Sequence, residues 1–326
     1  MTGLDEFVMD TVFLSESEIA IRVAQIILGT FVVLAVTISL IHRFRDVEHT
    51  YPKKDEGNKT TWKPLWVRLA TLMVLTLLVF VSAWWSAISF SIVISIILIL
   101  CLAEYHRFTE RSGTSPLRFY SYPGILFLIA GTISMGSQGM LIGLTAAILI
   151  FLLSLLTGYR NPDRIHQVGI GLFGVLYIGM LGAYMILIRH LPQGFGWVAF
   201  LLFVVQMADG LALLGGLAFG RHKLAPLLSP GKTWEGTVVG MLGAVLGGWL
   251  LSFAVPGVHT GLLLLMAALL GIAAFIGDLV ASAMKRIAGI KDFGTLLPGH
   301  GGILDRLDSY LVAAPTAWLL IRFWSP

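Results

Sequence analysis

Charged side chains are scarce in this chain. Lys, Arg, Asp and Glu make up 12% of the 326 residues, whereas soluble proteins carry about 25%. Hydrophobic residues make up 57%, and the mean hydropathy is +0.87. This composition excludes a soluble globular domain and indicates a polytopic membrane protein. The net charge of +4 therefore gives no reason to expect a nucleic-acid partner.

Cysteine and early basic residues are also scarce. The single cysteine, Cys101, lies in an apolar run, so an intramolecular disulfide is excluded. No Lys or Arg precedes Arg22. A signal peptide begins with a basic region, so we expect the first apolar helix to be retained.

Long apolar runs are abundant and divide the chain into ten segments. A helix that spans a bilayer needs about 20 such residues. We therefore predict an all-α, polytopic membrane protein with about 10 transmembrane helices, near 19–41, 67–84, 86–103, 121–136, 138–157, 168–189, 197–218, 236–254, 261–281 and 310–323. The pairs 67–103 and 121–157 can each also be read as one long helix with a broken middle. We expect an N-terminal part over 1–120 and a second part, which holds the polar motifs, over 121–326.

Basic residues concentrate in alternate loops. Of the 22 Lys and Arg residues, 19 lie in the five loops 42–68, 104–120, 158–167, 219–235 and 282–309. The positive-inside rule places these loops in the cytoplasm and the acidic N-terminus outside. The loop at 42–68 mixes both signs of charge and is typical of a solvated tether near anionic headgroups.

Several polar residues interrupt the apolar helices. The cluster from Glu104 to Arg107 closes one helix and is typical of an interfacial cap with charged tips in the headgroups. Asp209 ends an apolar run, and Asp278 shares a helix face with Ser282 and Lys285. A central aspartate costs about 2.5–3.5 kcal/mol on insertion scales. Each aspartate therefore has either a function or a structural lysine partner.

The loop at 220–236 contains the sequence SPGKT, which resembles part of a phosphate-binding P-loop. Pro226 stands where that motif requires glycine, so a P-loop is excluded. Hydroxyls and cations still precede a helix start, and this arrangement suits phosphate oxygens. Ordinary positive-inside charge is the alternative.

The last loop carries the densest polar cluster. His300 lies among glycines, and Gly301 and Gly302 let backbone amides approach an anion. Asp305 and Asp308 share one face at the start of the last helix. With no zinc-type His/Cys set in this chain, the carboxylates Asp278, Asp305 and Asp308 favour an oxygen-ligated cation, Mg²⁺ before others, with room for a second cation.

Two motifs together resemble the signature of the phosphatidate cytidylyltransferases, also called CDP-diacylglycerol synthases. The first is Ser282-x2-Lys285-Arg286-x4-Lys291-Asp292-x-Gly294-x3-Pro298-Gly299-His300-Gly301-Gly302-x2-Asp305-Arg306-x-Asp308. The second is Lys223-Leu224-x-Pro226-x2-Ser229-Pro230-x-Lys232-Thr233-x-Glu235-Gly236. The resemblance is strong over about 200–325 and weak before it.

The resemblance implies an integral membrane enzyme that joins CTP to phosphatidate and releases pyrophosphate, with CTP, phosphatidate and membrane lipids as partners. It places the metal-binding carboxylates on Asp278 and Asp305, near Asp308. It implies a bacterial inner-membrane location with the active site facing the cytoplasm. A homodimer is kept open. The expected catalytic residues are Ser282, Lys285, Arg286, Lys291, His300 and Arg306, and the expected substrate-binding residues are Lys223, Ser229, Lys232, Thr233, Gly301, Gly302 and Asp209.

Three alternatives remain at this point. The family usually has tyrosine where this chain has Leu213. One alternative is therefore that the chain belongs to a paralogous branch that uses another lipid phosphate acceptor. Asp209-Gly210 begins like the motif of the phosphotransferases that consume CDP-lipids, but the spaced aspartates do not follow. An ion-coupled transporter would use Asp209 and Asp278 as relays, yet the polar residues crowd one membrane face instead of a midplane path.

Overall fold

The structure is a computed structural model that describes residues 15–44, 65–294 and 301–324. Helices dominate it, and a single two-stranded hairpin joins two of them in the described residues. The elements are α1 (Glu16–Phe44), α2 (Leu65–Trp85), α3 (Ala87–Arg111), α4 (Arg118–Thr157), α5 (Arg164–Gly174), the π-helix η2 (Val175–Met180), α6 (Leu181–Arg189), α7 (Gly194–Phe219), β1 (Lys223–Ala225), β2 (Ser229–Thr233), α8 (Trp234–Leu250), the short 3₁₀ turn η3 (Ser252–Ala254), α9 (Thr260–Ile287) and α10 (Leu304–Trp324).

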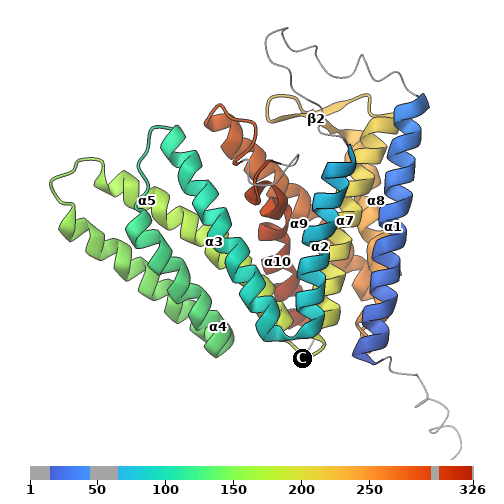
Figure 1. Ribbon diagram of the computed structural model, residues 1–326, viewed down its shortest axis with the longest axis horizontal. Helices are drawn as coiled ribbons and strands as arrows, with labels where there is room; N and C mark the ends of the chain where they lie inside the picture. The colour runs from blue at the N-terminus through green and yellow to red at the C-terminus, as the bar shows by residue number, and fades with distance from the viewer. Residues whose placement is uncertain (1–14, 45–64, 295–300, 325–326) are drawn as a thin grey trace, which may run out of the picture.

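Each of the ten predicted segments lies largely within a helix (Figure 1). Within the described residues, five helices are long and apolar enough to cross a membrane: α3, α4, the continuous α5–η2–α6 helix, α7 and α9. An all-α membrane protein is therefore confirmed. The β1–β2 hairpin is an addition that the apolar pattern did not predict, because its strands are short and polar.

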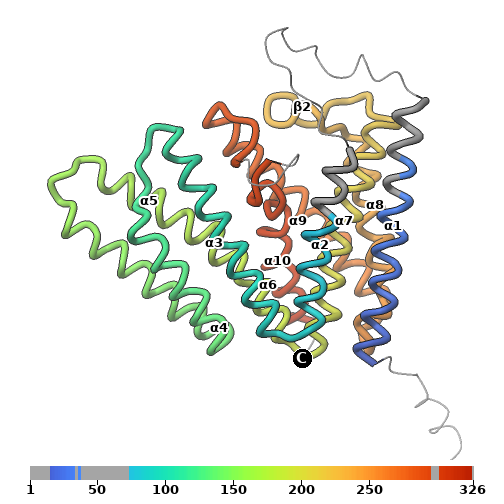
Figure 2. Tube along the Cα trace, in the orientation of Figure 1, coloured from blue at the N-terminus to red at the C-terminus, as the bar shows by residue number. Residues whose placement is uncertain are grey.

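Both segment pairs whose reading was open are broken in the middle. Ser86 has extended backbone angles between α2 and α3, and its hydroxyl accepts a hydrogen bond from the Ser89 amide, so α3 begins with a capping box. Gly136 has φ 61° and ψ −136° inside α4, and the two halves fold back on each other (Figure 2). A Cβ on Gly143 would lie 2.5 Å from the Leu128 backbone, so the two antiparallel halves are in close contact.

The described basic loops lie at one end of the molecule. The loops after α3 and before α5, the β1–β2 hairpin and the start of α10 are at the upper end in Figure 1, whereas the C-terminus and the α2–α3 turn are at the lower end. This arrangement follows from an alternation of up and down helices. We call the upper end the loop end.

Glycines bring the helices around the polar motifs into contact. A Cβ on Gly240 of α8 would lie 2.8 Å from the Ala208 carbonyl oxygen of α7. A Cβ on Gly277 of α9 would overlap the Asp308 carbonyl oxygen of α10. Small residues allow membrane helices to pack at backbone distance. The acidic residues of α7, α9 and α10 are therefore carried by directly packed helices.

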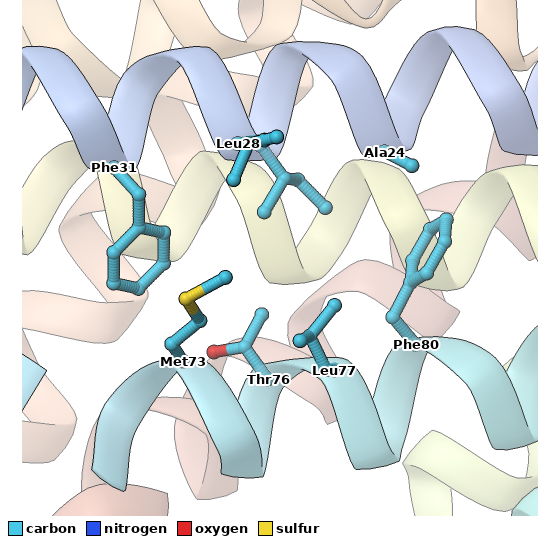
Figure 3. Close-up of a pocket in the computed structure, with 8 residues that line it drawn as sticks. Ala24, Leu28, Phe31, Met73, Thr76, Leu77 and Phe80 are labelled. Atoms are coloured by element: carbon cyan, nitrogen blue, oxygen red, sulfur yellow. The ribbon is translucent and has the colours of Figure 1, made fainter. Parts of the chain in front are cut away.

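The helices α1 and α2 form an apolar layer against this core. A small pocket between them is lined by Leu28, Phe31, Met73 and Phe80, with neighbouring apolar side chains (Figure 3). Thr76 is its one polar lining residue, and its hydroxyl accepts a hydrogen bond from Gln206 of α7 at 2.8 Å. The pocket thus lacks charged groups, and the polar chemistry lies elsewhere.

Candidate active site

One face of α9 carries three of the predicted residues. The Ser282 hydroxyl lies 3.5 Å from Asp278 Oδ1, and Lys285 follows one turn later on the same face. Gly277 allows α10 to approach this part of α9. The shared face predicted from the i, i+4, i+7 spacing is therefore present.

Lys285 reaches across to the first turn of α10. Its Nζ lies 2.8 Å from Asp305 Oδ1, and the two side chains are 13% and 5% exposed. The other carboxylate oxygen of Asp305 accepts hydrogen bonds from the Phe293 amide at 3.0 Å and the Gly302 amide at 2.9 Å. Asp305 thereby joins α9, α10 and both sides of the segment 295–300, which lies outside the described residues.

Lys232 of the hairpin reaches α9 in the same way. Its Nζ lies 2.7 Å from Asp278 Oδ2 and 4.4 Å from the centre of the Phe275 ring. This pair is more open, since Asp278 is 34% exposed. Arg286 adds a hydrogen bond from its Nε to the Leu228 carbonyl oxygen at 3.0 Å. The two predicted motif loops are therefore in contact.

The hairpin is fastened to α8. Lys223 pairs with Thr233 in the two-stranded sheet, and the Thr233 hydroxyl caps α8 by accepting from the Gly236 amide at 3.1 Å. Glu235 accepts hydrogen bonds from the amide and the ring of His222, the latter at 2.6 Å. Its own backbone amide and the His222 ring lower the pKa of the Glu235 carboxyl to about 2, so the Glu235 carboxylate stays ionised at neutral pH.

Two further carboxylates lie beside Asp278. Asp308 is buried and accepts a hydrogen bond from the Ser309 amide at 2.8 Å. The Ser309 hydroxyl lies 3.5 Å from Oδ2 of Asp209, which is exposed on α7. Gly277, next to Asp278, packs against the Asp308 backbone. The packing thus brings one acidic residue each from α7, α9 and α10 to the same part of the molecule.

The predicted metal ligands are not gathered as a ready-made set. In residues 15–44, 65–294 and 301–324, no three His, Cys, Asp or Glu side chains are grouped closely enough to hold a metal ion. Asp278 and Asp305 each contact a lysine instead. Metal binding at Asp278, Asp305 and Asp308 stays a prediction.

The remaining predicted residues differ in their surroundings. Lys291 is exposed, Arg306 is half-buried, and Gly301 has a φ of 84°, in the left-handed region that favours glycine. Ser229 lies half-buried in β2. His300 lies outside the described residues.

The interpretation of Glu104 as an interfacial cap is wrong. Glu104 and His106 are 1% and 0% exposed, and only Arg107 of this cluster is exposed. Glu104 points at the start of α10, where it accepts a hydrogen bond from the Leu304 amide at 2.9 Å, and the His106 ring packs edge-on against Tyr122. Sequence reasoning missed Glu104 because its partner lies 200 positions away. A polar cluster at a helix end has the same sequence pattern whether its residues are buried or lie at the membrane interface.

Residues 66–324 match the sequence profile of the cytidylyltransferase family. The chain belongs to this family. It is 34% identical over 257 residues to a phosphatidate cytidylyltransferase of Brucella abortus. The aligned region covers 78% of this chain and 92% of the relative. A phosphatidate cytidylyltransferase of Bacillus subtilis is 34% identical over 225 residues, covering 64% and 82% of the two chains. The Escherichia coli protein named "Uncharacterized protein YnbB" is 42% identical over 126 residues, covering 39% and 42%.

The family assignment made from the two motifs is therefore confirmed. In this cytidylyltransferase-family chain, both motifs lie at the loop end and contact each other through Arg286 and Leu228, while Lys232 reaches Asp278, one turn before Ser282. Cations and carboxylates are held within reach of one another, and ion pairs of this kind can exchange partners when a polyanion enters.

Proposed function

We propose that this chain transfers the cytidylyl group of CTP to phosphatidate, giving CDP-diacylglycerol and pyrophosphate, as a step of phospholipid biosynthesis. The observation that carries the proposal is the meeting of the two family motifs through Arg286 and Leu228, beside the ion pairs made by Lys232 and Lys285. Family membership and the names of the relatives support it.

The chemistry requires charge neutralisation more than proton transfer. A phosphate monoester has a second pKa of about 6, so phosphatidate is mostly dianionic at neutral pH. One of its oxygens forms a bond to the α-phosphorus of CTP, the bond from that phosphorus to the bridging oxygen of the β-phosphate breaks, and pyrophosphate leaves. A general base is unnecessary. Two polyanions must meet, and the cations Lys232, Lys285, Arg286, Lys291 and Arg306 lower the repulsion between them.

A magnesium ion fits the acidic residues, although the described part of the chain holds no ready-made set. Mg²⁺ is commonly held by one or two carboxylates together with substrate phosphates and water. Asp278 is a third exposed, and α10 packs at backbone distance on the neighbouring Gly277, which brings Asp308 to the same place. Asp278 and Asp305, with Asp308, would hold the ion, which would offset the charge of the leaving pyrophosphate.

The proposed setting is the bacterial inner membrane, with about ten spans and the loop end in the cytoplasm. The alternation of helices and the gathering of basic loops at one end support this orientation. CTP would then reach the loop end from the cytoplasm, and phosphatidate would come from the inner leaflet. A homodimer stays a prediction, which light scattering of the purified protein in detergent would test.

The test is an assay of purified protein with CTP, Mg²⁺ and a panel of lipids that includes phosphatidate, with mass spectrometry of the products. We expect CDP-diacylglycerol and pyrophosphate, and no product after chelation of Mg²⁺. Asp278→Asn and Asp305→Asn should each lower the rate at least about 100-fold. Full activity in either variant removes the metal proposal, and release of CMP in place of pyrophosphate removes the reaction.

A paralogue with another lipid phosphate acceptor is the second candidate. Leu213 is 51% exposed one turn after Asp209 on α7, where the family usually has tyrosine. The same lipid panel decides, since such a paralogue would leave phosphatidate unused and convert another phospholipid phosphate.

A further inference from the structure

The carboxyl group of Glu104 lies where α3 meets both ends of the α9–α10 connection. Its Oε2 accepts a hydrogen bond from the Leu304 amide at 2.9 Å, and the residue is 1% exposed. Its Oε1 is buried and accepts no hydrogen bond from the described residues. Burial of a carboxyl group is costly unless hydrogen bonds compensate for it, so the position of this side chain calls for a reason beyond a single helix cap.

Two motif glycines enclose this carboxyl group. A Cβ on Gly294 would lie 2.7 Å from Glu104 Cδ, and a Cβ on Gly302 would lie 2.9 Å from the same atom. The latter would also lie 2.9 Å from the Gly294 amide nitrogen, so the two glycines are close to each other as well. Neither has a positive φ. A side chain at either position would therefore displace the Glu104 carboxyl, although neither backbone conformation requires glycine.

The same two chain segments hold Asp305. The amides of Phe293 and Gly302, which adjoin or belong to the glycine pair, donate to Asp305 Oδ2. Asp305 in turn holds Lys285. A shift of Gly294 relative to Gly302 would separate these amide donors and release Asp305. Glu104 thus contacts the two segments whose amides hold the carboxylate of the Lys285–Asp305 pair.

We propose that Glu104 is a positioning residue of the active site. Its carboxyl fixes the spacing between Gly294 and Gly302 and the start of α10, and thereby holds Asp305 and Lys285 in place for the polyanionic substrates. The inference rests on the proposed function. It also assigns a role to Gly294 and Gly302, which together with Glu104 form a size-matched set.

A double-mutant cycle tests the size match. Glu104→Asp shortens the side chain by one methylene, whereas Gly294→Ala adds a methyl group that overlaps the carboxyl. We expect Gly294→Ala to lower kcat about 100-fold in the wild-type background, because small displacements at an active site have effects of this size. In the Glu104→Asp background it should cost less than about three-fold, because the shorter side chain leaves room.

The matched control is Gly169→Ala in α5, where an added Cβ meets nothing within 4 Å. It should leave kcat unchanged in both backgrounds. The KM for CTP should change little in the Glu104 variants, because Glu104 is 1% exposed and so is not available to contact CTP. The same loss from Gly294→Ala in both backgrounds would overturn the proposal.

Hydrogen exchange separates this inference from the proposed reaction. In protein without substrates, Glu104→Ala should speed exchange at the amides of Phe293, Gly302 and Leu304, while amides in α7 stay protected. Faster exchange at these three amides in a protein that makes no CDP-lipid would support the positioning role and remove only the reaction. Unchanged exchange in Glu104→Ala, in a protein that makes CDP-diacylglycerol, would remove only the positioning role.

Discussion

Two lysines near the loop end each hold an aspartate, but in different surroundings. Lys285 and Asp305 are 13% and 5% exposed, and two backbone amides also donate hydrogen bonds to the carboxylate. Lys232 and Asp278 are 19% and 34% exposed, and among the described residues the second oxygen of Asp278 faces only the Ser282 hydroxyl, at 3.5 Å. Both pairs belong to the proposed site, but the first is also tied to the backbone, whereas the second is more open to an incoming substrate.

This contrast predicts different results for the two lysines. Lys285→Met should destabilise the protein by about 3–5 kcal/mol, because it leaves a buried carboxylate without its cation. Lys232→Met should cost less than Lys285→Met, since the Asp278 left behind is 34% exposed and can be hydrated, but it should raise the KM for CTP about ten-fold. Thermal unfolding in detergent and steady-state kinetics measure the two quantities. Equal losses of stability would contradict the assignment.

Glu104 shows what residue patterns alone do not reveal. Its contacts with Gly294, Gly302 and Leu304 depend on how α3 packs against α10, and helix spacing gives no information about that packing. By contrast, the common face of Asp278, Ser282 and Lys285 follows from the 3.6-residue period and was predicted correctly. Short-range geometry can be predicted from the chain, but contacts between distant helices cannot.

At the scale of elements, α4 depends on one backbone conformation. Gly136 has φ 61° and ψ −136°, a combination that is essentially restricted to glycine, at the turn between the two halves of the hairpin. The apolar pattern predicted the break near this residue, because the run is too long for one span. It did not predict the close contact of the halves at Gly131, Gly139 and Gly143, which comes from packing.

Gly136→Ala should therefore destabilise the hairpin by about 1–3 kcal/mol, through backbone strain without any loss of contacts. Thermal unfolding in detergent would show a lower midpoint. Gly29 lies in the helical backbone of α1 with open space around it, so Gly29→Ala is the control and should be neutral or slightly stabilising. A Gly136→Ala midpoint equal to that of wild type would mean that the turn is not strained by a side chain.

The β1–β2 hairpin is the element that the sequence pattern did not predict. Its strands hold three and five residues, too few for an alternating pattern to be recognised. Sequence reasoning predicted that Ser229, Lys232 and Thr233 bind phosphate, which stays a prediction, and it did not predict the pairing of Lys232 with Asp278. That pairing requires the hairpin to fold over α9, a tertiary arrangement that Glu235 and Arg286 help to fix.

For the whole molecule, the basic loops and the polar motifs share one end (Figure 1). The positive-inside rule then predicts that this end faces the cytoplasm. Asn161 is exposed between α4 and α5 at the loop end, and Pro192 is exposed between α6 and α7 at the other end. Cys101 is 0% exposed, so the natural thiol adds little background to a labelling experiment.

In right-side-out membrane vesicles, a membrane-impermeant maleimide should label Pro192→Cys at once and Asn161→Cys only after permeabilisation. Wild-type protein, with Cys101 alone, is the control and should stay unlabelled in both conditions. The reverse pattern would place the motif loops outside, and it would also remove the proposed access of CTP from the cytoplasm.

The π-helix Val175–Met180 has a consequence for how relatives are aligned. It lies inside one continuous helix from Arg164 to Arg189, and a π segment contains one residue more than the α turns it replaces. Deletion of a single residue there would restore regular winding and rotate everything on one side by about 100°. A one-residue gap at this position in an alignment therefore indicates that the homologue has a regular α-helix here, in which the residue matching Tyr177 points in another direction. It does not indicate an alignment error or a missing span.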